Sequence, residues 1–382
     1  MDEDKFFNQL LKYQESKEGI PNVDMNIPVA VDRGHKGTIG LEIEIEGENL
    51  PNDGHLNHIK GKETGAIWLA TKDGMLRGEA REYIFDRPCS KGEVKDLLIQ
   101  LFESFKVYRS KLDLSNRCST HVHINMSRKY INQVTSVIAL WGVFEEAIIK
   151  NFCGEDRTSN HYCLSLQDSE TLIKAWQFYL DTGKPPVDKN AYKYSALNVV
   201  PLWDLGSIEF RCGPAVDEPE TPSIWALFLD HFVDYVTKKY PNPQTIAHEM
   251  SELGGWQMFS TICGEDHEEM FQKVTEGYSH REFDSLCMRG FRNIQPLVLG
   301  YPWDKWLPLI QRPHIPNPFD KKVKKIVINK ARAAYVDAPL QPAPRFRDAD
   351  LQQQVEEVNI RRQVEEAQQQ IRQMYVGRGD RG

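Results

Sequence analysis

Three glutamates, Glu42, Glu44 and Glu46, alternate with apolar residues in the stretch GTIGLEIEIEG at residues 37–47. Alternation with a period of two predicts a β-strand that has one apolar face and one acidic face. Glutamate is disfavoured in strands, and like charges along one strand face repel one another. Two interpretations follow, which are a strand face turned to solvent or a row of carboxylates that binds a hard cation.

Three later stretches also place metal-competent or phosphate-competent side chains on predicted strands. In THVHIN and in SIEFRCG, two such residues lie two positions apart and therefore share one strand face. Carboxylates with a supplementary histidine suit Mg²⁺ or Mn²⁺, and an arginine beside them suits a phosphate group. The sequence thus predicts a cleft for a divalent metal and nucleotide phosphates. The residues concerned are Asp73, Glu79 and Glu82 in KDGMLRGEAREYIF, His121, His123 and Asn125 in THVHIN, and Glu209 and Arg211 in SIEFRCG.

The order of these motifs resembles the amidoligase family of the carboxylate–amine ligase superfamily, which is related to glutamine synthetase and glutamate–cysteine ligase. The ordered set is more specific than any single motif. It extends over roughly residues 37–240. The motifs are GLEIEIE, DG-L followed by E-Y-I, HVHIN, and Tyr194-x-x-Leu197-Asn198 followed by IEFR.

The resemblance implies an ATP-dependent ligase with an α+β fold. Such a fold has a curved antiparallel sheet of the glutamine-synthetase type, helices packed on one face, and ATP with two divalent metal ions, Mg²⁺ or Mn²⁺, on the sheet. ATP phosphorylates a substrate carboxylate, and an amine then attacks the acyl phosphate to give an amide. The expected partners are small-molecule or peptide amines and carboxylates. Proteins of this type are common in bacteria and their phages.

The resemblance also implies roles for individual residues. Arg211 would steady the transferring phosphoryl group, Asp73 would lie in the amine pocket, and Glu82 would act both in catalysis and as a metal ligand. Met75 departs from the family pattern, in which serine more often follows the DG pair. The implied metal ligands are Glu42, Glu44, Glu82, Glu209 and either or both of His121 and His123. The implied nucleotide or substrate contacts are Arg211, Asn198, Tyr194 and Asn125.

The composition is that of an ordinary globular protein. The 382 residues include 47 basic and 55 acidic side chains, and a net charge of −8 argues against general binding to nucleic acids or membrane surfaces. Seven scattered cysteines without a CxxC pair predict free thiols in a reducing compartment. The N-terminal segment lacks the apolar core of a signal peptide, and no apolar run is long enough to span a membrane. We therefore expect a cytoplasmic protein.

Changes in composition along the chain predict four segments. Residues 1–36 form a lead-in helix, residues 37–318 the catalytic domain with a helical subregion at 251–318, residues 319–348 a basic stretch and Pro-rich linker, and residues 349–382 a Gln-rich helix and tail. Within residues 349–374, an apolar stripe with heptad-like spacing offers a surface for self-association or for a protein partner. The stripe consists of Ile360, Val364, Ala367, Ile371 and Met374.

Two further interpretations compete with the ligase. Cys118, His121 and His123 could bind zinc, although no fourth ligand is evident. The chain could also be an inactive ligase-like scaffold that acts through its C-terminal helix. The grouped carboxylates and Arg211 argue against a scaffold, because burying like charges together has no purpose in a dead site. The sequence does not identify the substrates.

Overall fold

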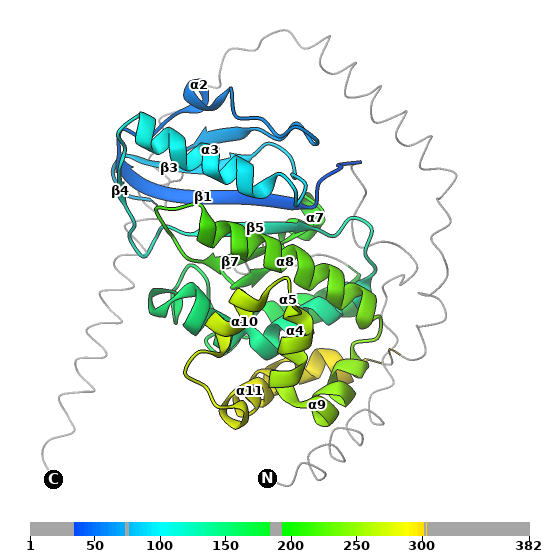
Figure 1. Ribbon diagram of the computed structural model, residues 1–382. Helices are drawn as coiled ribbons and strands as arrows, with labels where there is room; N and C mark the ends of the chain where they lie inside the picture. The colour runs from blue at the N-terminus through cyan, green and yellow to red at the C-terminus, as the bar shows by residue number, and fades with distance from the viewer. Residues whose placement is uncertain (1–33, 73–75, 184–192, 302, 304–382) are drawn as a thin grey trace, which may run out of the picture. The chain divides into compact units, whose positions relative to one another are not determined.

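The computed structural model describes residues 34–72, 76–183, 193–301 and 303. One open sheet forms the centre of this part of the chain, and all its strand pairs are antiparallel (Figure 1). Strand β4 (Lys111–Asp113) pairs with the last residues of β1. In spatial order, the other strands are β2 (Trp68–Thr71), β3 (Ala80–Phe85), β1 (Ile39–Glu48), β5 (Thr120–Asn125), β7 (Ser207–Gly213) and β6 (Leu197–Asn198).

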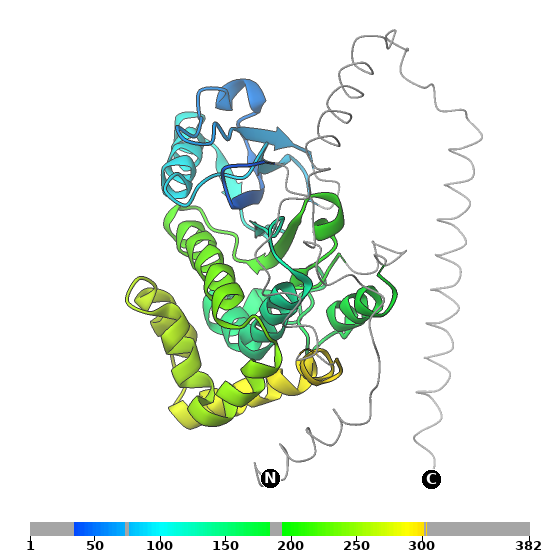
Figure 2. The same cartoon turned by 90° about the vertical axis from the view of Figure 1, so that its right-hand side faces the viewer.

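Helices α3 (Val94–Val107) and α8 (Glu220–Lys239) cover one face of the sheet (Figure 1). Figure 2 shows both helices on the same side of the strands. Leu41, Ile43 and Ile45 of β1 are buried in one core with the apolar stripes of both helices. The period-two pattern of β1 therefore separates an apolar face, packed against helices, from an acidic face. The apolar residues of α3 recur at helical spacing and are buried, namely Val94, Leu97, Leu98, Leu101, Phe102 and Phe105.

Helix α4 (Ile131–Ala147) is buried nearly all round, as its continuous apolar sequence predicts. It packs against α8 and against α11 (His280–Leu299). Gly142 and Gly290 permit the close approach of α4 and α11, because a Cβ at Gly290 would lie 2.3 Å from the Gly142 carbonyl oxygen. The other helical elements are α2 (Asp53–Leu56), a π-helix (Ile148–Cys153), a 3₁₀ turn (Glu155–Arg157), α5 (Thr171–Thr182), α7 (Pro201–Asp204), α9 (Gln244–Cys263) and α10 (Glu268–Thr275).

The expected antiparallel sheet and mixed helix–strand fold are confirmed, whereas the specific ligase fold type stays a prediction. Strands β6 and β7 pair with each other, and the short helix α7 connects them. All seven cysteines are free and buried, as predicted. No helix within the described ranges is long and apolar enough to cross a membrane. The predicted helices at 1–36 and 349–382 and the linker at 319–348 lie, apart from residues 34–36, outside the described residues.

The carboxylate of Glu93 fixes the loop at residues 61–65 to the start of α3. It accepts hydrogen bonds from the backbone of Glu63, from the backbone and hydroxyl of Thr64, and from the backbone of Ser90. Burial alone would raise the pKa of Glu93, but these donors lower it to about 2. Ionised Glu93 therefore stabilises the fold above pH 4.5, and this contribution is lost as the pH falls from 4.5 toward 2.

Replacing Glu93 with glutamine should lower the melting temperature by roughly 3–6 °C at pH 7, because an amide cannot accept all of these hydrogen bonds. The difference from the wild-type protein should narrow as the pH falls below 4.5. Melting curves followed by circular dichroism between pH 7 and pH 3 measure both effects, with Glu103→Gln, an exposed change on the same helix, as the control. A difference that stays constant with pH would contradict this role.

Candidate functional site

Strand pairing brings the predicted polar residues of three strands together on the acidic face of the sheet. In the register of β1 and β5, Glu42 lies opposite His121, and in that of β5 and β7, His123 lies opposite Glu209. Directly paired residues of antiparallel strands point to the same face. The central strands β1, β5 and β7 therefore supply one cluster from segments that are far apart in the sequence.

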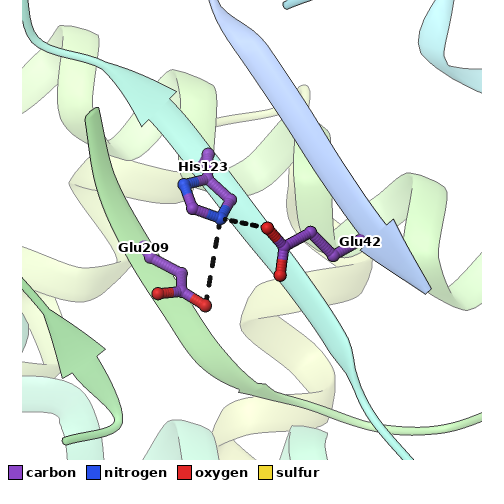
Figure 3. Close-up of side chains that lie close together, drawn as sticks. All are labelled: Glu42, His123 and Glu209. Carbon is purple, nitrogen blue, oxygen red and sulfur yellow. Dashed lines mark hydrogen bonds and ion pairs between the residues drawn. The ribbon is translucent and has the colours of Figure 1, made fainter. Parts of the chain in front are cut away.

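Glu42, His123 and Glu209 form a candidate metal centre, which we call the triad (Figure 3). One ligand atom from each residue lies within 4.8 Å of the others. Nε2 of His123 lies 3.0 Å from Oε1 of Glu42 and 3.9 Å from Oε1 of Glu209. Nδ1 of His123 contacts the Ser207 hydroxyl at 3.1 Å, which orients the ring with Nε2 toward the carboxylates. Two carboxylates and one imidazole are a suitable donor set for Mg²⁺ or Mn²⁺.

Charge pairing within the triad shifts the pKa of two of its members. Burial alone would raise the pKa of Glu42, but His123 and His121 hold it well below its ordinary value. Burial alone would lower the pKa of His123, but Glu42 and Glu209 raise it to about 9. An imidazolium thus balances the carboxylates at neutral pH when no cation is bound. A metal ion that binds here must displace this proton.

His121 lies next to the triad, and both of its ring nitrogens also contact protein groups. Nδ1 lies 3.0 Å from Oε2 of Glu42, and Nε2 lies 2.7 Å from the hydroxyl oxygen of Ser119. The Ser119 hydroxyl donates in turn to the carboxylate of Glu44. Nδ1 of His121 also lies 3.3 Å from Oε1 of Glu209, so each histidine directs one nitrogen toward both Glu42 and Glu209. His123 is the one that belongs to the candidate metal group, and His121 is the more deeply buried of the two.

Ser119, His121 and Glu42 also lie in the order of a nucleophile, a base and an orienting carboxylate. Covalent catalysis by this group is not supported, for two reasons. The Ser119 hydroxyl donates its proton to Glu44 and so has none to give to His121. Ser119 is also only 2% exposed, so a substrate cannot reach it. Ser119 is better understood as a support for the acidic face.

Arg211 lies beside Glu209 on β7. Its Nη1 donates to Oε1 of Glu209, and its Nε donates to the carbonyl oxygen of Tyr162 at 3.4 Å. Burial alone would lower the pKa of Arg211, but Glu209, Glu44 and Glu42 raise it, so the guanidinium stays charged. The other oxygen of Glu209 accepts a hydrogen bond of 2.7 Å from the Asn198 amide. Asn198 thus orients a triad carboxylate.

Strand β7 contains a β-bulge at Arg211. Thr120 pairs with Gly213 while Val122 pairs with Phe210, so that one residue of β5 faces two residues of β7. A bulge changes the direction of nearby side chains and leaves backbone groups without ladder partners. The buried guanidinium of Arg157 donates to the Arg211 carbonyl oxygen at 2.9 Å and to the Cys118 carbonyl oxygen at 3.3 Å. Arg157 therefore holds the bulge against the segment that leads into β5.

The remaining predicted residues lie around the triad rather than in it. Glu82 is opposite Glu44 and accepts a hydrogen bond from Thr71, while Glu46 accepts one from the backbone of Arg77. These carboxylates continue the acidic row along β1 and β3. Tyr194 packs against Tyr162, Asn125 lines a cavity, and Glu79 is exposed.

Two residues of the sequence analysis remain, Asp73 and Cys118. Asp73 lies outside the described residues. The thiol of Cys118 contacts the carbonyl oxygen of Asp113, and among the described residues the candidate metal group does not include it. The zinc alternative therefore gains no support.

Two supporting residues were missed in the sequence. Ser119 lies two positions before His121, so extending the period-two pattern by one step would have found it. Arg157 carries no local signal, because its partners are carbonyl groups of segments distant in the sequence.

A cavity of about 270 Å³ adjoins the triad. Glu42 and His123 form one end of it, and the strands continue along its floor to Gly40, Asn125 and Ser207. Gly40 leaves space beside His123, because a Cβ at this position would lie only 3.1 Å from the Cβ of His123. A polar floor beside apolar walls is typical of small-molecule pockets. The apolar wall residues include Ile84, Phe85, Pro88 and Leu205, and the charged residues Asp86 and Arg87 also line the cavity.

No protein-family model matches the chain, and no curated protein matches it significantly. The amidoligase resemblance therefore rests on the ordered motifs alone.

Because the candidate metal group contains His123 and not His121, we expect different metal affinities for two matched variants. His123→Gln should weaken Mn²⁺ binding by about 100-fold or more, and His121→Gln by roughly tenfold, because loss of a ligand costs more than loss of an orienting contact. Isothermal titration of the full chain with Mn²⁺ measures both, with the exposed His161→Gln as the control. Equal losses for His121→Gln and His123→Gln would contradict the assignment.

Proposed function

We propose that this protein is an ATP-dependent carboxylate–amine ligase that forms an amide bond through an acyl phosphate. The observation that carries the proposal is the convergence of Glu42, His123, Glu209 and Arg211 on one face of an antiparallel sheet. Phosphoryl transfer depends mainly on positioning and on neutralising charge. A donor set for a divalent cation beside a fixed guanidinium meets both needs.

The reaction has two steps. A carboxylate oxygen of the acceptor acid attacks the γ-phosphorus of ATP, the bond to the β,γ-bridging oxygen breaks, and ADP leaves. The amine nitrogen then attacks the acyl carbon, the bond to the phosphate oxygen breaks, and inorganic phosphate and a proton are released. Neither step needs a nucleophile from the protein, which agrees with the engaged and buried hydroxyl of Ser119.

The residues of the chain have distinct tasks in this proposal. Glu42, His123 and Glu209 would hold a divalent cation, which when bound neutralises charge on the phosphate oxygens. Arg211 would bind the transferring phosphoryl group through the N–H groups that Glu209 and Tyr162 leave available. His121 and Ser119 keep the carboxylates of Glu42 and Glu44 in place, and Asn198 does the same for Glu209.

The position of the cavity indicates how ATP and the acceptor acid would lie along the sheet. Along β7, Ser207 lines the cavity, Glu209 belongs to the triad, and Arg211 lies beyond it. The apolar walls of the cavity suit a nucleoside, so the phosphates would extend from the cavity across the triad toward Arg211. The acceptor acid would then approach from the side of Arg211.

Hydroxylamine provides a test that needs no knowledge of the amine, because it traps acyl phosphates as coloured hydroxamates. The full chain with ATP, Mg²⁺, hydroxylamine and a panel of carboxylic acids should release ADP and form a hydroxamate with at least one acid. Glu209→Gln should abolish both signals, since it removes a triad carboxylate. ADP release without any hydroxamate would indicate an ATPase and contradict the ligase.

A second prediction concerns Arg211. Arg211→Lys keeps the positive charge but loses the planar fork, which gains most as charge spreads over the transferring phosphoryl group. We expect turnover to fall by on the order of 100-fold, with a much smaller change in ATP affinity. Steady-state rates and an ATP titration measure the two effects, and Arg289→Lys, at an exposed ion pair with Glu146, is the matched control. A loss confined to ATP affinity would instead make Arg211 a ground-state contact.

A further inference from the structure

Two tyrosines and two cations extend the site beyond Arg211, and we call them the Tyr162–Tyr194 cluster. The two rings meet edge to face, with their centroids 6.4 Å apart. Cζ of Arg117 lies 5.8 Å from the centroid of the Tyr162 ring, and Nζ of Lys193 lies 4.8 Å from that of Tyr194. All four side chains are half-buried. They therefore form an ordered surface that a ligand can still reach.

Backbone contacts tie this cluster to Arg211. The carbonyl oxygen of Tyr162 accepts a hydrogen bond from Arg211 Nε, and the backbone N–H of Arg211 donates to Ala196 at 2.8 Å. The Tyr162 and Tyr194 segments are joined to each other, because Leu164 donates to the carbonyl oxygen of Tyr194 at 2.7 Å. The cluster is thus held at a fixed place relative to the guanidinium that would bind the phosphoryl group.

Because carboxylates are concentrated on the acidic face, cations in the Tyr162–Tyr194 cluster matter for the binding of an acid. The acidic face carries the carboxylates of Glu42, Glu44 and Glu209, and the charge of Arg211 is already paired with Glu209. An acceptor acid that approached this face without further cations would be repelled. Arg117 and Lys193 supply two positive charges at the cluster, which backbone hydrogen bonds join to Arg211.

The reacting carboxylate of the acceptor does not account for both Arg117 and Lys193. It must move away from these two cations to reach the phosphoryl group at Arg211. A guanidinium held over a ring can still present its N–H edge to an anion, and the tyrosine hydroxyls add hydrogen-bond donors. The cluster therefore has the chemistry to hold a separate anionic group during the reaction.

We infer that the Tyr162–Tyr194 cluster binds a second anionic group of the acceptor, so that the preferred substrates are acids with two negative charges. This inference rests on the proposed ligase function, because that function sets the direction from which the acceptor acid approaches. The second group is a carboxylate or a phosphate, which the cluster would bind through the same donors.

The test compares three acids of similar length binding to the full chain without nucleotide. Glutarate carries a second carboxylate, 3-phosphonopropionate carries a phosphonate, and butyrate carries one charge only. Ligand-observed NMR titrations should give at least roughly tenfold tighter binding for one or both dianions than for butyrate. The stronger of the two dianions identifies the second group.

Arg117→Gln/Lys193→Gln should reduce dianion binding to the level of butyrate. The matched control is Lys95→Gln/Lys111→Gln, which removes the same net charge from two exposed ion pairs with Glu220 and Glu48. Arg117 and Lys193 are half-buried while Lys95 and Lys111 are exposed, so circular dichroism must show folded protein for both variants before their binding is compared. An equal loss in the control, or equal binding of all three acids by the wild-type chain, would overturn the inference.

The hydroxamate assay separates this inference from the proposed function. Hydroxamate formation without a preference for dianions would overturn the subsite and leave the ligase intact. Tight binding of dianions without any ATP-dependent product would overturn the ligase and leave an anion-binding surface at the cluster.

Discussion

The central constraint on this structure is the concentration of carboxylates on one face of the sheet. Side chains two residues apart on a strand, or directly opposite on neighbouring strands, lie only about 5–7 Å apart, so like charges there repel strongly once water is excluded. The fold meets this constraint with cations and donors taken from the same strands. His121 and His123 of β5 and Arg211 of β7 each contact at least one carboxylate. A protonated His123 and the guanidinium of Arg211 offset part of the charge of these carboxylates.

The rigidity of this face comes from the opposite side of the sheet. The apolar side chains of β1 belong to a continuous core that includes α3, α8 and α4. Because a packed core allows little movement, the strands hold their polar side chains at fixed separations. The bulge in β7 is the one irregularity in the ladder between β5 and β7, and the buried Arg157 supports it. Arg211 is thereby held by a strand, and the buried side chain of Arg157 fixes its backbone carbonyl group.

The chemical groups on the polar face differ from one end of the strands to the other. It begins at a cavity with apolar walls, continues through the triad, and reaches Arg211 and the Tyr162–Tyr194 cluster. A ligand that combines an aromatic base, a chain of phosphates and a charged acceptor would match this order in one orientation only. A serine hydrolase is not supported, since the proton of Ser119 goes to Glu44, and the zinc site with Cys118 gains no support, since its thiol contacts the carbonyl oxygen of Asp113.

The sequence by itself determined which side chains share a strand face and which helix stripe is buried. Both follow from local backbone geometry, with periods of 2 and 3.6 residues, and the apolar residues of β1 and α3 are buried accordingly. Only the tertiary structure decided which strands are neighbours and in what register. Glu42 and His121 are 79 residues apart, and their contact depends on the pairing of β1 with β5. The choice of His123 over His121 and the clamp by Arg157 depend on such pairings too. No local pattern encodes them, because long-range pairing is selected by the packing of the whole core.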